Sequence, residues 1–248
     1  MTTTAATTMQ EHEMVRRDVL DRLQGALVVS CQAYPGEPMR DPRTTVQVAQ
    51  SVVRGGAAGV RVQGIEDIAA VTGEVDVPVV GLWKDGDDDV FITPTLEHAL
   101  AVARAGADIV AIDGTRRPRP DGRTLAETIA GLRERYPDVA IMADCGSLAD
   151  ALAAQAAGAD CVGTTLAGYS GERPRTDGPD FELVDEMVAQ CSVPVVVEGR
   201  VHTPAQAAEA LARGAASVCV GTAITHPTTI TSWFVEAVTG APVPTAGH

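Results

Sequence analysis

Lysine occurs only once in this chain, and its amine differs in chemistry from the guanidinium groups of the arginines. The sequence contains 18 arginines and a single lysine, Lys84. Wherever a positive charge only keeps a surface in water, this chain uses arginine. A buried ammonium group can lose its proton near neutral pH, whereas a guanidinium group stays charged. Lys84 is therefore the first candidate for a base or a nucleophile.

Polar residues follow nearly every short apolar run of the sequence. Such runs are typical of buried strands, and α/β barrels carry their chemistry at the carboxyl ends of their strands. In chain order, these polar or small residues are Gln32, Arg61, Lys84, Asp113, Asp144, Thr164, Thr165, Glu198, Arg200, Gly221 and Thr222. An ordered set of this kind predicts one polar site that contains Lys84.

A purely structural interpretation is open for several of these residues. Four of them could instead cap helices, close turns or satisfy loop carbonyls, namely Asp113, Asp144, Gln32 and Arg61. Glu198 follows the apolar run 194–197, where an ionised carboxylate needs a partner, and Lys84 or Arg200 could provide it. These alternatives stay open at the level of the residues.

Two turns rich in small residues predict a phosphate site. Barrels often bind phosphate with the loops that follow strands seven and eight. The segments 198–207 and 220–227 supply backbone donors and hydroxyl groups there, with Gly199, Gly221 and Thr222 as the candidate contacts. The net charge of −14 opposes an anionic ligand, but a focused local positive charge outweighs a distributed negative one.

A recurring pattern supplies the elements that must position these residues. The segments 54–62, 104–113, 156–165 and 213–222 each resemble the end of an Ala-rich helix, a glycine cap and a short β-branched run. With the apolar runs between them, they predict eight strands that start near residues 26, 58, 78, 108, 139, 160, 194 and 217.

The segments between the predicted strands have helical periodicity. They cover residues 44–54, 96–105, 125–136, 148–157, 181–190 and 204–213. Wholly apolar strands separated by amphipathic helices indicate a parallel sheet covered by helices. Eight regular units without a linker favour a (β/α)8 TIM barrel, an α/β fold, over an open doubly wound sheet.

The predicted barrel is a single domain that spans residues 14–240. Residues 14–24 are expected to form an extra N-terminal helix that covers the amino end of the barrel, and residues 228–238 the last helix. The Thr-rich segment 1–13 is expected to be disordered, and residues 241–248 are expected to form a loose tail.

Composition excludes several classes of protein. Only 3% of the residues are aromatic and the net charge is −14, which argues against a nucleic-acid partner. No segment approaches the roughly 18 apolar residues of a membrane span. Five cysteines without C-x-x-C or zinc-finger spacing predict reduced thiols and no metal site. With no secretory signal pattern, the cytoplasm is the expected location.

Several segments are more specific than any general folding rule requires. They are VVSCQAYPGEPMRDP (28–42), DGTRRPRPDG (113–122), MADC (142–145), GTTLAGY (163–169), DFELV (180–184), VEGRVHTPAQA (197–207) and VGTAITHP (220–227). From about Ala26 to Val238, the chain resembles the N-acetylmannosamine-6-phosphate 2-epimerases of sialic-acid catabolism. The resemblance implies a (β/α)8 barrel, a sugar phosphate as substrate, no metal or organic cofactor, and a homo-oligomer, expected to be a dimer.

The resemblance also implies roles for individual residues. Lys84 matches the family's catalytic lysine, and Glu198 matches the carboxylate that acts with it. Sugar contacts are implied for Gln32, Arg61, Asp144 and Arg200, and phosphate contacts for Gly221 and Thr222. Three further residues are candidates for the site: Asp113, Thr164 and His226.

At three places the chain departs from the family's usual pattern. His226 stands where an arginine is usual, which affects the expected phosphate site. Asp85-Gly86-Asp87 follows the lysine, where an arginine and a tyrosine are usual. Gly146 stands where a serine is common.

The implied reaction is inversion at C2 of an N-acyl hexosamine 6-phosphate, from N-acetylmannosamine 6-phosphate to N-acetylglucosamine 6-phosphate. It requires a base that removes the proton α to the C1 carbonyl of the open-chain sugar, and a donor on the opposite face. Arg61 and Arg200 are expected to push Lys84 towards its neutral form. Glu198 is expected to be the second acid or base, directly or through a substrate hydroxyl.

Two alternative functions stay open. The first is another phosphate-binding barrel enzyme, an aldolase or synthase, in which Lys84 forms a Schiff base. The second is a sugar-phosphate sensor that keeps the barrel and has no catalytic activity.

Overall fold

Runs of β-branched and other apolar residues form the strands of this chain, as the sequence predicts. The computed structural model describes residues 2–34 and 36–243. Each predicted strand start lies within one residue of the observed one. The strands are β1 (Ala26–Cys31), β2 (Gly59–Gln63), β3 (Val79–Leu82), β4 (Ile109–Asp113), β5 (Ala140–Asp144), β6 (Cys161–Gly163), β7 (Val195–Glu198) and β8 (Ser217–Val220).

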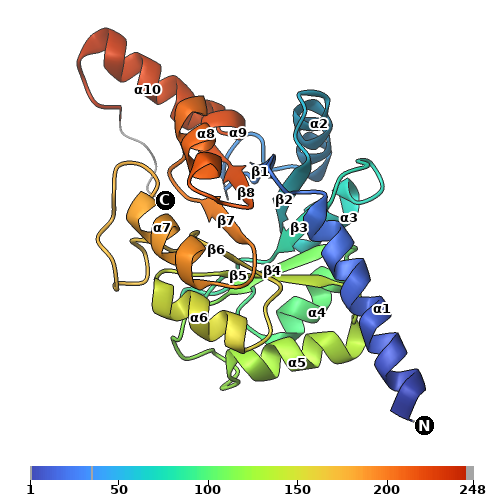
Figure 1. Ribbon diagram of the computed structural model, residues 1–248. Coiled ribbons are helices and arrows are strands. Elements are labelled where there is room, and N and C mark those ends of the chain that lie inside the picture. Colours follow the sequence, from blue (N-terminus) through green and yellow to red (C-terminus); the bar gives the residue numbers. More distant parts are fainter. Residues whose placement is uncertain (1, 35, 244–248) are drawn as a thin grey trace.

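The strands form a closed parallel barrel in sequence order (Figure 1). Each strand pairs with the next, and β8 returns to β1, where Ala26 lies opposite Ser217 and Val29 opposite Val220. This closure confirms the (β/α)8 barrel and excludes the open sheet. Because all strands run in one direction, their carboxyl ends meet at one end of the barrel, which we call the barrel mouth.

Helices follow the strands, and polar side chains define where several of them begin. Thr124 and Thr203 each form a capping box with the residue three positions later. The helices that follow strands are α2 (Pro42–Arg54), α3 (Ile65–Val71), α4 (Leu96–Arg104), α5 (Leu125–Arg135), α6 (Leu148–Ala156), α7 (Phe181–Gln190), α8 (Pro204–Ala212), α9 (Thr222–Thr225) and α10 (Pro227–Thr239). Sequence periodicity did not predict α3, since its seven residues make only two turns.

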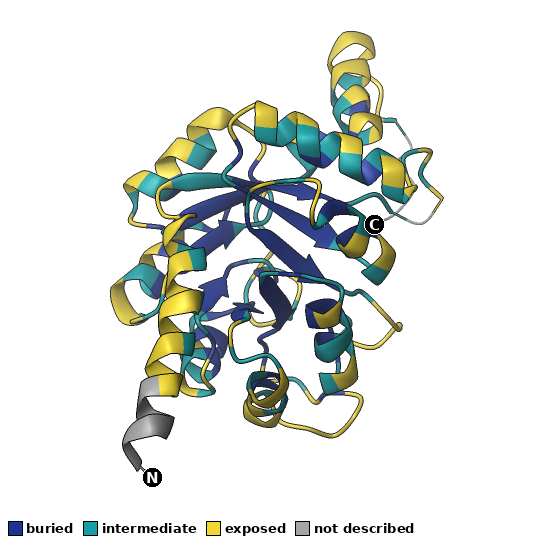
Figure 2. Cartoon of the chain, turned by 90° about the vertical axis from the view of Figure 1, so that its right-hand side faces the viewer, coloured by how far each residue is buried: buried dark blue, intermediate teal, exposed yellow. Residues whose placement is uncertain are grey.

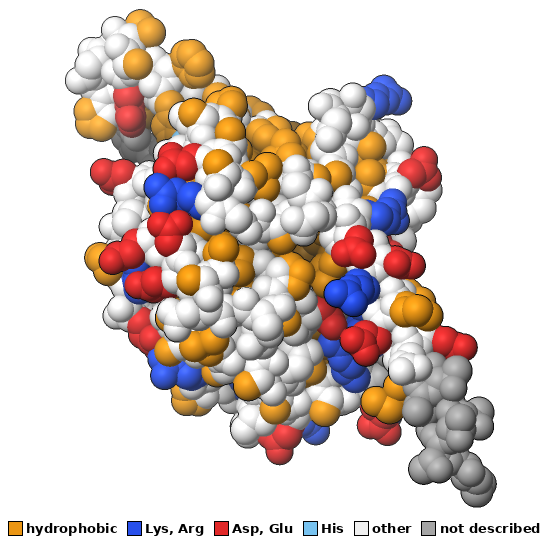
Figure 3. All heavy atoms as spheres, in the orientation of Figure 1, with side chains coloured by type: hydrophobic (Ala, Val, Ile, Leu, Met, Phe, Trp, Pro, Cys, Tyr) orange, Lys and Arg blue, Asp and Glu red, His pale blue; other side chains and the backbone are white. Residues whose placement is uncertain are grey.

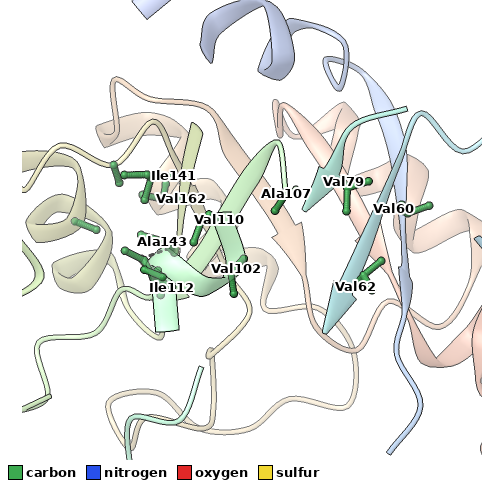
Figure 4. Close-up of a cluster of buried hydrophobic side chains, with 14 of the residues drawn as sticks. Val60, Val62, Val79, Val102, Ala107, Val110, Ile112, Ile141, Ala143 and Val162 are labelled. Atoms are coloured by element: carbon green, nitrogen blue, oxygen red, sulfur yellow. Dashed lines mark hydrogen bonds between the residues drawn. The ribbon is translucent and has the colours of Figure 1, made fainter. Parts of the chain in front are cut away.

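The core has two layers, one outside the strands and one inside the barrel. Figure 4 shows part of the outer layer, in which Val110 of β4 lies near Val102 of α4, while Val60 and Val62 of β2 belong to the same cluster. Figure 2 shows the strands buried and the covering helices exposed on one face only. The inner layer includes Val80, Leu82, Ile109 and Met142, which fill the barrel below its mouth. Alternating strand residues thus serve the two layers in turn.

The N-terminal helix α1 (Thr2–Asp21) covers the amino end of the barrel, as expected. Val19, Leu20 and Leu23, at and just after its end, pack against the inner layer. The helix nevertheless begins at Thr2 rather than at residue 14, so residues 2–13 of the segment 1–13, which was expected to be disordered, are helical. A helix extends at little cost once a packed segment has nucleated it. Arg16 anchors that segment through hydrogen bonds to Pro137 and Asp160.

The last helix, α10, packs beside α9 and then extends away from the barrel (Figures 1 and 2). Its ring contact with the loop before α8 joins Trp233 and His202, whose centroids are 5.1 Å apart. Gly240 ends the helix in the left-handed conformation. The loose tail was expected to cover residues 241–248, of which 244–248 lie outside the described residues. In the described part of this tail, the N–H of Val243 donates to the side chain of Glu236. No described helix is long and apolar enough to cross a membrane.

Candidate active site

Strand alternation directs a charged residue into the barrel. Val60 and Val62 of β2 belong to the outer layer, so Arg61 between them points towards the barrel axis. Only 2% of Arg61 is exposed. Asp144 and Glu198 end β5 and β7, and their side chains reach the same place. An interior arginine therefore meets two carboxylates just below the barrel mouth.

Arg61 holds both carboxylates at once. Its Nη1 and Nη2 atoms donate to the two oxygens of Asp144 at 3.1 and 2.6 Å, and Nη1 also lies 2.9 Å from Glu198 Oε2. The hydroxyl of Thr165 lies 2.6 Å from Asp144 Oδ1 and 3.5 Å from Glu198 Oε2. Burial alone would lower the pKa of Arg61, but Asp144 and Glu198 outweigh it and raise that pKa. Arg61 is thus a permanent cation that orients two acids.

Glu198 is the carboxyl group of this cluster that is suited to hold a proton. Burial raises its pKa above the ordinary 4.5, and Asp144 adds to this effect, while Arg61 and Lys84 oppose it. Its backbone is fixed by Thr164, whose hydroxyl donates to the Glu198 carbonyl at 2.8 Å and accepts from the Glu198 N–H at 3.1 Å. The expected site residue Thr164 therefore acts here by holding the end of β7.

Lys84 lies two residues beyond the end of β3, at the mouth, where the sequence places it. Burial and then Arg61 lower the pKa of its amine from the ordinary 10.5, while Glu198 and Asp144 act in the opposite direction. Within the described residues, no carboxylate lies within salt-bridge distance of Nζ. Lys84 is thus a candidate base that can reach its neutral form.

Arg200 follows β7 as predicted, but its side chain contacts a neighbouring loop. It follows Gly199 in a turn where both residues have positive φ angles, 107° and 56°. Its guanidinium group donates to the carbonyls of Ala167 and Gly178 at 2.8 and 3.1 Å and to the hydroxyl of Thr176 at 3.0 Å. Arg200 therefore holds the β6–α7 loop, and it is absent from the groups that shift the pKa of Lys84.

Asp113 has the structural alternative that the sequence left open for it, because its carboxylate binds groups of its own loop. Its carboxylate accepts from the N–H and the hydroxyl of Thr115 at 2.8 and 2.6 Å and pairs with Arg117 at 3.0 Å. Arg119 donates to its backbone carbonyl. Burial raises the pKa of Asp113, and these contacts partly offset that rise. Asp113 therefore organises the β4–α5 loop outside the Arg61 cluster.

The β1–α2 loop and the β8 end form another side of the mouth. Gln32 donates to the hydroxyl of Ser30 at 2.8 Å, and Thr225 donates to the Ser30 carbonyl at 2.7 Å. Beside them lies His226, which is 4% exposed and whose ring centroid is 4.9 Å from that of Tyr34. This loop thus joins the end of β1 to the α9–α10 junction.

The three expected phosphate contacts lie at the ends of neighbouring strands. Gly199 follows β7, and Gly221 and Thr222 follow β8 and begin α9. A side chain at Gly221 would place its Cβ only 3.1 Å from the Cβ of Ser30, so this turn needs a small residue. The structure brings Gly199 and Gly221 to the same side of the mouth.

Two further residues lie near the amine and the carboxylates. Thr165, one of the predicted strand-end residues, lies between the two carboxylates. Tyr34 was not predicted as a site residue. The ring of Tyr34 lies with its centroid 5.4 Å from Lys84 Nζ. The only sequence signal for Tyr34 is its place close to Gln32 in the family-specific segment 28–42. In the described part of the chain, no group of three or more His, Cys, Asp or Glu side chains is placed to hold a metal ion.

Two curated bacterial proteins resemble this chain over most of its length. One from Cutibacterium acnes is 58% identical over 222 residues, which cover 89% of this chain and 96% of that protein. One from Enterobacter sp. is 46% identical over 226 residues, which cover 90% and 96%. Both carry the name "Putative N-acetylmannosamine-6-phosphate 2-epimerase".

A solved structure resembles the barrel closely. It is that of the N-acetylmannosamine-6-phosphate 2-epimerase from Clostridium perfringens, with 35% sequence identity and a TM-score of 0.84 over 88% of this chain and 95% of that one. The model of the family described as "Putative N-acetylmannosamine-6-phosphate epimerase" matches residues 45–240. With its strand-end lysine, its Arg61 cluster and these similarities, the chain belongs to the N-acetylmannosamine-6-phosphate 2-epimerase family.

Proposed function

We propose that this chain interconverts N-acetylmannosamine 6-phosphate and N-acetylglucosamine 6-phosphate by moving the proton at C2. The observation that carries the proposal is an amine of lowered pKa and a carboxyl group of raised pKa at one barrel mouth. Family membership supports the substrate. The activity belongs to the breakdown of sialic acid and other amino sugars.

Lys84 and Glu198 are suited to act on opposite faces of the sugar. Lys84 follows β3 and Glu198 ends β7, and these two strands lie opposite each other in the ring of strands. Epimerisation at C2 needs one group to remove the proton and a second to deliver a proton to the other face. The neutral amine of Lys84 takes the C2 proton, electrons shift to the C1 carbonyl, and protonated Glu198 returns a proton from the far side.

The surrounding residues stabilise and orient the reacting sugar. Arg61 places positive charge beside the enolate as it forms, and its ion pair with Asp144 already fixes this charge in position. Gln32 and Asp144 present polar atoms to the sugar hydroxyls. Arg200 contributes by holding the β6–α7 loop over the mouth.

The phosphate binds at the ends of β7 and β8 in this proposal. Gly199, Gly221 and Thr222 supply backbone N–H groups and a hydroxyl from two adjacent turns. His226 lies one helical turn beyond Thr222 and adds to this side of the mouth. The positive φ angle of Gly199 supports a turn whose backbone can approach an anion closely.

The reaction itself provides the test. Each of the two sugar phosphates is incubated with the purified chain in D2O and followed by NMR. We expect both to reach the same mixture, with deuterium at C2 of the sugar. The absence of interconversion from either side would refute the proposal. A reduced covalent adduct at Lys84 after borohydride treatment would instead support the Schiff-base alternative.

We place the reaction in the cytoplasm. All five cysteines are free thiols, and four of them are buried: Cys31, Cys145, Cys161 and Cys219. Burial raises the pKa of Cys31 to about 12. Buried thiols of this kind suit a reducing compartment, where phosphorylated sugars are also found.

A second copy of this chain is the partner that we propose for α10. The helix exposes large apolar side chains, with Phe234 exposed by 69% and Val238 by 84%. Ile224 and Val235 continue this surface, and Figure 3 shows hydrophobic side chains gathered on the projecting helix. A helix that leaves its own barrel can pack reciprocally with the same helix of another copy, which gives a symmetric dimer.

A further inference from the structure

Lys84 has an aromatic neighbour that the proposed reaction leaves without a role. The ring centroid of Tyr34 lies 5.4 Å from Lys84 Nζ, within the distance of a cation–π contact. No carboxylate of the described residues lies within 4.0 Å of that nitrogen. An aromatic face, rather than an ion pair, therefore contacts the amine.

The ring of Tyr34 is held in place by its own loop and by His226 at the α9–α10 junction. The backbone N–H of Tyr34 donates to Glu37 Oε2 at 2.8 Å, and the backbone N–H of Glu37 donates to the Tyr34 carbonyl at 3.1 Å. His226 packs on the ring with a centroid distance of 4.9 Å. An ion pair of 2.6 Å between Arg40 and Asp67 ties the same loop to α3. Tyr34 is thus a fixed surface against which the lysine side chain rests.

An aromatic ring in this position has two opposite effects on an amine. Its negative face stabilises the ammonium form. Its bulk excludes water, which favours the neutral form. We infer that Tyr34 is a positioning residue for Lys84, whose ring fixes the amine at the mouth and balances its two protonation states. The inference rests on the proposed function, in which Lys84 is the base.

The other charged groups that face Lys84 come from three strands. Arg61 of β2 lowers its pKa, whereas Glu198 of β7 and Asp144 of β5 raise it. Arg61 pairs with both Asp144 and Glu198 and so holds the three groups together. Substitution of Tyr34 leaves this cluster in place, so a change in the pKa of Lys84 reports the ring itself.

The single lysine makes a direct measurement possible. Lysine labelled with ¹³C at Cε gives one side-chain signal in the intact chain, and its chemical shift follows the protonation of Lys84 without any activity assay. The titration is run on the wild type and on Tyr34→Phe, Tyr34→Leu and Tyr34→Ala. Tyr136→Leu is the matched control, because Tyr136 ends α5 away from the mouth.

The three substitutions separate the two effects of the ring. Tyr34→Phe keeps the aromatic face, so the pKa of Lys84 stays as in the wild type. Tyr34→Leu keeps an apolar cover but loses the negative face, so the pKa falls by about half a unit. Tyr34→Ala admits water, so the pKa rises. Tyr136→Leu leaves it unchanged.

Opposite shifts of the Lys84 pKa in Tyr34→Leu and Tyr34→Ala support the inference. A loop that only loses structure would shift this pKa in the same direction in both variants. Equal shifts, or no shift in either variant, would overturn it. The kinetic profile then tests the proposed function separately. If the pKa of Lys84 moves in the NMR titration while the pH profile of kcat/KM does not follow, the positioning role stands and Lys84 as the base fails.

Discussion

Two cations lie close together in this site, and only one of them can lose its proton. Burial and Arg61 lower the pKa of Lys84, whereas the Arg61 guanidinium is held charged by Asp144 and Glu198. The site therefore combines a permanent positive charge with an amine that titrates. This combination suits a base that works beside a developing enolate.

Replacement of Lys84 by arginine separates charge from basicity. Lys84→Arg keeps a positive charge but provides no base near neutral pH. A positioned general base contributes at least about 100-fold, so we expect kcat to fall by that factor or more. Circular dichroism and thermal unfolding should match the wild type, because the residue lies at a strand end. A variant that retains more than about a tenth of kcat would remove Lys84 from the mechanism.

The pH profile of kcat/KM should be bell-shaped and narrow. In the proposed reaction Lys84 is neutral while Glu198 is protonated, so the two groups together hold one proton. Activity is then expected to rise with pH through the lower apparent pKa and to fall through the higher one. Ordinary values are 4.5 for a glutamate and 10.5 for a lysine. Burial raises the pKa of Glu198 and lowers the pKa of Lys84, so the rising and falling limbs of the pH profile lie closer together. A profile flat from pH 5 to 10 would contradict the pairing.

The sequence predicted which residues stand at the mouth, but not how they pair. Arg61, Asp144 and Glu198 come from strands that lie far apart in the sequence and meet only across the closed barrel. Arg200 was expected beside Lys84, yet a positive φ angle turns it towards the β6–α7 loop. Such a turn depends on tertiary contacts that local sequence patterns do not contain.

At the scale of elements, two loops at the mouth fit together through a glycine. A Cβ atom at Gly146 of the β5–α6 loop would lie 2.7 Å from the Cβ of Ser170 in the β6–α7 loop and 3.1 Å from the Leu166 carbonyl oxygen. Ser170 fills the space that a serine at 146 would need, which explains this departure from the usual family pattern.

Gly146→Ala should therefore destabilise the fold, and Ser170→Gly should compensate. We expect the alanine to cost about 1–3 kcal/mol through overpacking. The hydroxyl of Ser170 is buried without a hydrogen-bond partner in the described residues, so its removal costs little by itself. Urea unfolding of both single variants and the double variant measures the coupling. Strictly additive effects would mean that the two loops do not compete for this space.

The loops after β7 and β8 should make the phosphate necessary for efficient turnover. Unphosphorylated N-acetylmannosamine lacks the anion that these turns are proposed to bind. Two charge-assisted hydrogen bonds of about 1.5 kcal/mol each correspond to roughly 100-fold. We therefore expect kcat/KM to fall by about that factor in steady-state assays. Comparable values for the two sugars would remove the phosphate site from these loops.

For the whole molecule, sequence periodicity predicted the strands of the barrel well and the first and last helices poorly. The apolar runs placed all eight strand starts within one residue, because buried parallel strands have few alternatives in sequence. The length of α1 and the direction of α10 were not predictable. Both depend on what the helix packs against, and amphipathic periodicity does not identify the partner.

Charge on the exposed face of α10 should separate the proposed dimer. The double variant Phe234→Glu with Val238→Glu places two like charges where a second copy is expected to pack. Light scattering after gel filtration should give twice the chain mass of 25.7 kDa for the wild type and one mass for the variant. Met14→Glu, at an apolar side chain of α1 that is 59% exposed, is the control and should stay dimeric. A monomeric wild type would refute the proposal.

The joint between β1 and β8 also imposes an order on synthesis. Residues 26–29 are synthesised long before their partners at 217–220. Until then, every nascent barrel has two open strand edges, which can pair with other chains. Such long-range pairing also slows folding. A chain that stops just before Ser217 keeps both edges open, so it is expected to aggregate rather than form a smaller barrel.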